Sequence, residues 1–76
     1  MYYDVSKEQY VILTFVRDMG MANNKDTVLK YYRQYRVWSY VEYLIGFISN
    51  DTREKLNEKF KSIMKNRLEE LKHDEL

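Results

Sequence analysis

The chain contains no proline and only two glycines, Gly20 and Gly46, among its 76 residues. Sheets built from short strands reverse direction often, and proline and glycine make most of the tight turns that such reversals need. The chain is therefore predicted to form a few long elements and not an all-β fold. Apolar residues make up 45% of the sequence and charged residues 33%, which is the balance of a globular protein. We expect one all-α domain over residues 1–76.

The first predicted helix covers residues 6–19. Ser6 and Gln9 have the spacing of a capping box, and Gly20 fits the left-handed position that ends many helices. At 100° per residue, the apolar residues of this helix cover an arc of about 200°. They are Val11, Ile12, Leu13, Phe15, Val16 and Met19. We expect a helix this apolar to be nearly buried; a strand over 10–16 is the alternative, but the segment lacks the alternation of a half-buried strand.

The segment 25–48 reverses its apolar face halfway along. Three residues can cap its start: Asn23, Asn24 and Asp26. In the first half, Val28, Tyr31, Tyr32, Tyr35 and Trp38 cluster on one side, whereas Val37, Tyr40, Val41, Leu44, Phe47 and Ile48 point to the opposite side. Either the helix breaks or kinks near residues 36–39, between helices over 25–36 and 37–48, or one straight helix about 36 Å long buries its halves against different partners. The second arrangement requires another chain, because 76 residues cannot cover both sides of such a helix.

The last predicted helix covers residues 51–72. Ser49, Asn50 and Asp51 are successive candidates for its N-cap. Its apolar residues fall within about 140° of one another, and mixed charges occupy the rest of its surface. These apolar residues are Leu56, Phe60, Ile63, Met64, Leu68 and Leu71. No apolar residue anchors the chain between Leu71 and its last residue, so residues 72–76 are expected to fray. The predicted architecture is a small bundle of three to four helices.

The sequence offers almost no material for catalysis or metal binding. It contains no cysteine and a single histidine, His73, so thiolate nucleophiles and zinc–thiolate sites are excluded and acid–base chemistry is poorly supplied. No glycine-rich phosphate loop is present, and no pair of carboxylates lies in an apolar setting. We therefore expect no catalytic, metal-binding or cofactor-binding residues, no small-molecule substrate and no enzymatic activity.

No targeting segment is evident. Residues 1–10 carry Asp4, Lys7 and Glu8 in place of a basic start followed by an apolar core, and the longest apolar run, 10–13, is too short to span a membrane. The last four residues spell His-Asp-Glu-Leu, a retrieval signal of the endoplasmic reticulum, which we interpret as a charged helix end. A cytoplasmic protein without membrane contact is expected.

The aromatic content favours protein–protein contact as the function. Eight tyrosines, three phenylalanines and one tryptophan exceed what a small helical core easily buries, and tyrosine and tryptophan carry much of the binding energy of interfaces. The reversed apolar face is a second reason to expect another chain. The predicted interface consists of Trp38, Tyr40, Val41, Leu44 and Phe47. We expect a small regulatory protein that acts through helical contacts, as a homodimer or with a protein partner.

The alternative is a protein that binds DNA. Residues 7–38 resemble a helix-turn-helix, in which the helix from about residue 25 would enter the major groove. The residues predicted to contact DNA are Asn24, Lys25, Lys30, Arg33, Gln34 and Arg36. The net charge of only +1 is far from the basic balance typical of nucleic-acid binding, so nucleic acid is the second choice of partner.

Overall fold

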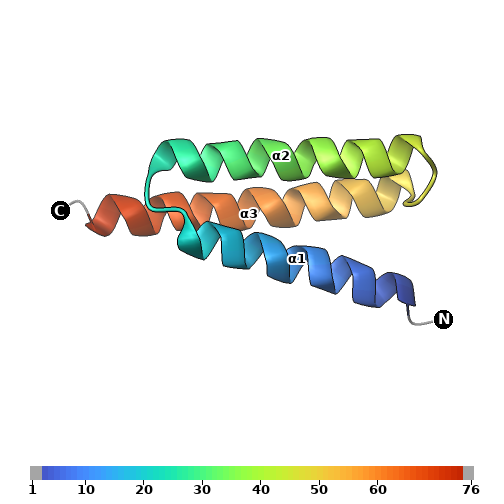
Figure 1. Cartoon of the computed structure of the whole chain (residues 1–76), viewed down its shortest axis with the longest axis horizontal. Coiled ribbons are helices and arrows are strands. Elements are labelled where there is room, and N and C mark those ends of the chain that lie inside the picture. Colours follow the sequence, from blue (N-terminus) through green and yellow to red (C-terminus); the bar gives the residue numbers. More distant parts are fainter. Residues whose placement is uncertain (1–2, 75–76) are drawn as a thin grey trace.

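The computed structural model describes the backbone of residues 3–74 and the side chains of residues 8–72. Within this range the chain forms three α-helices: α1 (Tyr3–Met21), α2 (Lys25–Leu44) and α3 (Asn50–Asp74). Figure 1 shows α1 and α3 running in the same direction, with α2 running in the opposite direction beside them. The prediction of a small all-α bundle is confirmed, and no strand is present among the described residues.

Both predicted ends of α1 are wrong. The helix begins at Tyr3, so Ser6 lies inside it and is not its N-cap. At the other end, Gly20 is helical: it does not have a positive φ angle, and the Ala22 amide donates to the Asp18 carbonyl oxygen at 3.0 Å. The last carbonyl groups of α1 are instead satisfied by α3. The Arg67 guanidinium donates to the carbonyl oxygen of Ala22 at 3.1 and 3.3 Å and to that of Gly20 at 3.4 Å, which places a cation at the negative end of the helix dipole.

Helix α2 is a single helix and continues without a break through residues 36–39. Asn24 is its N-cap, and its Oδ1 accepts from the Thr27 amide at 2.9 Å. The helix ends at Leu44, four residues before the predicted end, in a Schellman motif. In this motif the Phe47 amide donates to the Glu42 carbonyl oxygen at 2.9 Å. Gly46 has a φ of +84°, so it occupies the left-handed position that the sequence assigned to Gly20.

Helix α3 is capped by Ser49, whose Oγ accepts from the Thr52 amide at 3.1 Å. The helix starts at Asn50, one residue before the predicted start, and continues to Asp74. Residues 72–74 of the expected frayed tail are therefore helical, and residues 75–76 lie outside the described range.

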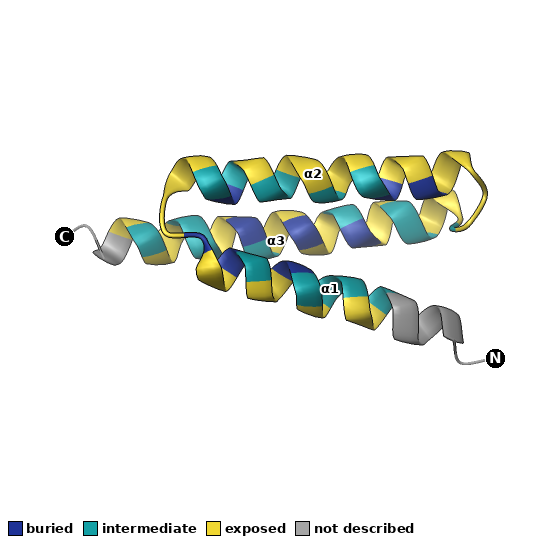
Figure 2. Ribbon diagram, in the orientation of Figure 1, coloured by how far each residue is buried: buried dark blue, intermediate teal, exposed yellow. Residues whose placement is uncertain are grey.

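The hydrophobic core lies where the three helices meet. Its buried apolar residues are Phe15, Met19, Ala22, Val28, Leu56, Phe60 and Met64. The Phe15 ring lies 4.7 Å from the rings of both Tyr35 and Phe60, between centroids, so one aromatic cluster joins all three helices. Helix α2 packs most extensively against α3, and α1 has little contact with α2. Figure 2 shows that each helix keeps one exposed side.

We expected α1 to be nearly buried, and this expectation is wrong for the residues at one edge of its apolar arc. Leu13 is 67% exposed and Val16 45% exposed, whereas Phe15 and Met19 are buried. Two neighbouring helices cover a narrower sector of α1 than the arc of about 200° that its apolar residues span. Some of these apolar residues therefore remain on the surface.

Candidate interaction surface on helix α2

The side of α2 that faces the bundle carries polar residues in its second half. Ser39 is fully buried and Glu42 is 8% exposed. Ser39 Oγ lies 3.0 Å from Asn57 Oδ1 of α3 and 2.8 Å from the carbonyl oxygen of Arg36, so the buried hydroxyl is satisfied. The inner face of α2 thus changes from aromatic to polar near Ser39, as the sequence pattern predicted.

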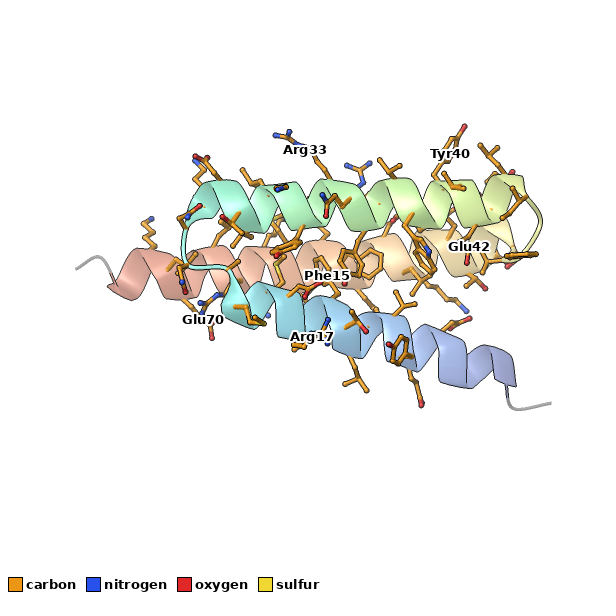
Figure 3. The ribbon with its side chains drawn as sticks, in the orientation of Figure 1. Phe15, Arg17, Arg33, Tyr40, Glu42 and Glu70 are labelled. Carbon is orange, nitrogen blue, oxygen red and sulfur yellow. The ribbon has the colours of Figure 1, made fainter. Side chains whose placement is uncertain are left out.

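The opposite side of the same half is apolar and faces solvent. Val37, Tyr40, Val41 and Leu44, which we call the α2 stripe, are between 46% and 62% exposed. Ile45 and Phe47 extend this surface into the turn that follows the helix. Figure 3 shows Tyr40 on the outer side of α2 and Glu42 on the side that faces the other helices. Because α2 is unbroken, its two apolar halves face different surroundings, and only the first half is covered by this chain.

Trp38 does not join the α2 stripe. It is half-buried and lines an open groove of about 470 Å³ between α1 and α2, together with Tyr10, Tyr35 and Glu42. Four of the five predicted interface residues, Tyr40, Val41, Leu44 and Phe47, therefore form one exposed surface, and Trp38 lies on a neighbouring one. The spacing of Trp38 along the helix, which placed it with the first apolar half, already indicated this difference.

Tyr35 also lines that groove, and its side chain links α2 to α1. Its hydroxyl donates to Asp18 Oδ2 at 2.6 Å. Burial raises the pKa of Tyr35 far above its ordinary value, and the hydrogen bond and the negative charge of Asp18 raise it further. The phenol is therefore a neutral structural donor and not a group that ionises near neutral pH.

The residues predicted to contact DNA do not form one face. Asn24 is occupied as the N-cap of α2, and Gln34 lines the groove on the α1 side. Lys25, Lys30, Arg33 and Arg36 are exposed, and the last two line a groove that they share with residues of α3. Helices α1 and α2 also run in roughly opposite directions (Figure 1), whereas the helices of a helix-turn-helix cross steeply.

The sequence analysis did not single out Arg53. This third arginine belongs to α3 and lines the same groove as Arg33 and Arg36. The α3 periodicity placed Arg53 among several interchangeable surface charges. Arg53 can be identified only from the packing of α3 along α2, because that packing decides which residues of the two helices become neighbours.

No protein-family model, curated protein or solved structure matches this chain. Among residues 8–72, whose side chains the structure describes, no group of three or more His, Cys, Asp or Glu is placed to hold a metal ion. None of the helices in the described range combines the length and the apolar character needed to span a bilayer.

Proposed function

We propose that this protein is a non-enzymatic regulatory or interaction protein that acts through helical protein–protein contacts and forms a homodimer through the α2 stripe. The observation that carries the proposal is the unbroken helix α2, with Ser39 and Glu42 buried and Val37 and Leu44 exposed on the opposite side. A helix that directs its apolar residues outward and its polar residues inward gains stability when a second surface covers the outer side.

The size of the exposed surface supports a dimer. The α2 stripe with Ile45 and Phe47 comprises six apolar side chains that are 46–68% exposed. We estimate their exposed area at about 600 Å², from the usual size of such side chains. Two copies that covered this surface completely would together bury about 1,200 Å², which is the lower end of the range for specific interfaces.

A second copy is the occupant that fits this surface best. The α2 stripe itself contains no charged side chain, so two stripes related by a two-fold axis bury no charge at the centre of the contact, and the neighbouring Arg33 and Arg36 lie at its rim. Tyrosine at the centre of such a contact covers a large area at a low cost in conformational entropy.

The test is the molar mass of the protein in solution, measured by light scattering and by sedimentation velocity at high micromolar concentration. The wild type should show a concentration-dependent mass that approaches twice the 9.4 kDa of one chain. Leu44→Glu should lower the measured mass to that of the monomer, because burying an unpaired carboxylate in the dimer interface costs several kcal/mol. Leu44 is 61% exposed in the single chain, so the helical circular dichroism should not change.

Leu13→Glu is the matched control, since Leu13 is 67% exposed and lies on α1, outside the α2 stripe. This variant should dimerise as the wild type does. The proposal is overturned if the wild type stays monomeric at high micromolar concentration. It is also overturned if Leu13→Glu and Leu44→Glu reduce the mass equally.

A further inference from the structure

A shallow groove between α2 and α3 gathers three arginines. It has a volume of about 330 Å³ and lies on the side of α2 away from α1. Arg33, Arg36 and Arg53 line it, and Val37, Tyr40 and Asn57 complete its walls. Figure 3 shows Arg33 extending from α2 away from the other two helices. The groove therefore combines positive charge with an apolar wall.

Two of these guanidinium groups are held in place by aromatic rings. The Arg36 guanidinium lies 5.5 Å from the centre of the Tyr32 ring, and that of Arg53 lies 5.3 Å from the centre of the Tyr43 ring. Arg53 also donates to Asn50 Oδ1 at 2.6 and 3.1 Å. Contact through the flat face of a guanidinium leaves N–H groups at its edge available for a carboxylate. Side chains held in advance lose less conformational entropy when a ligand binds.

The three arginines have no acidic partner within the described residues. The ion pairs there join Arg17 to Asp18 and Arg67 to Glu70. Helix α2 contains only Asp26, in its first turn, and the buried Glu42 as acidic residues. None of the three guanidinium groups therefore forms an ion pair within the described residues, and on α3 Glu54 is linked to Arg53 only through Asn50, whose Nδ2 donates to Glu54 Oε1 at 3.2 Å.

We propose that this groove binds an acidic segment of a partner protein, with carboxylates on Arg33, Arg36 and Arg53 and an aliphatic side chain over Val37 and Tyr40. Arginine binds carboxylates through paired hydrogen bonds, which gives both strength and orientation. Nucleic acid fits less well, because Val37 offers no hydrogen-bond donor to a phosphate backbone and the net charge of the chain is only +1.

The inference does not depend on self-association, but the two surfaces share Val37 and Tyr40. An acidic segment and a second copy therefore compete for these two side chains. Binding of the segment should lower the dimer fraction, and by thermodynamic linkage dimerisation should weaken the binding of the segment to the same degree.

The probe is a fluorescein-labelled peptide of four glutamates around two leucines, titrated with protein and followed by fluorescence anisotropy. Arg33→Gln with Arg36→Gln should weaken binding about tenfold or more, because the two lost charged hydrogen bonds are together worth at least a factor of ten. The matched control is Lys55→Gln with Lys59→Gln, which removes the same charge from a groove between α1 and α3 and should change the affinity less than about twofold.

A peptide in which serine replaces both leucines tests the apolar wall and should bind several-fold more weakly. Repeating the titration on Leu44→Glu separates groove binding from self-association, since a monomer that still binds the peptide supports the groove even where the dimer proposal fails. The inference is overturned if the peptide does not bind at millimolar protein, or if both double variants weaken it equally. It is also overturned if a duplex DNA binds more tightly than the peptide and loses affinity with Arg33→Gln and Arg36→Gln.

Discussion

The two glycines should respond to alanine substitution with opposite signs. Gly46 has a φ of +84° in the turn after α2, whereas Gly20 lies near the end of α1 in ordinary helical conformation. A Cβ added at either position meets no atom within 4 Å, so neither substitution causes a clash. The difference between the two variants therefore measures backbone conformation alone.

The magnitudes follow from that conformation. A non-glycine residue in the left-handed region costs about 1–2 kcal/mol, so Gly46→Ala should lower the free energy of unfolding by this amount. Gly20→Ala replaces a poor helix former by the best one and should raise the free energy of unfolding by about 0.5–1 kcal/mol. For a domain of this size, these changes shift the melting temperature by about 4–16 °C downward and about 2–8 °C upward, respectively.

The assay is unfolding by heat and by urea, followed by circular dichroism at 222 nm in dilute protein, so that self-association does not contribute. The urea slope should stay the same in both variants, because neither changes the area exposed on unfolding. Destabilisation by Gly20→Ala together with a neutral Gly46→Ala would refute the reasoning. That result would mean that the chain reverses at Gly20, as the sequence pattern alone suggested.

Two further substitutions probe contacts that hold the helices together. Tyr35→Phe removes the hydrogen bond to Asp18 and should lower the free energy of unfolding by about 1 kcal/mol in urea titrations at neutral pH. The pKa of Tyr35 is raised above its ordinary value of 10.0, so Tyr35 ionises at lower pH in the unfolded chain than in the folded one. The contribution of Tyr35 to the free energy of unfolding is therefore complete below pH 10 and is lost as the pH rises further. In alkaline titrations, Tyr35→Phe should lose less stability than the wild type. Arg67→Met keeps an apolar stem but removes the donors to the carbonyl groups of Gly20 and Ala22, and it should cost about 1–2 kcal/mol by the same measurement.

Most of the candidate surface could be predicted from sequence because it lies on one helix. Residues on a helix face each other or turn away according to a fixed angle of 100°, so the outward direction of Tyr40, Val41 and Leu44 follows from their spacing relative to Val28 and Tyr35. The arginine groove could not be predicted in this way. Arg53 comes from a different helix, and its distance to Arg36 depends on how far α3 is displaced along α2.

The sequence by itself determined the helical class and the two-sided character of α2, because both depend on local periodicity and on the absence of proline. The tertiary structure alone decided that α2 is unbroken, that Gly46 and not Gly20 is left-handed, and that Leu13 stays exposed. The physical reason is that helix ends and burial depend on the surfaces available for packing. The chain reverses where α3 can pair with α2, and a helix edge is buried only where a neighbouring helix reaches it.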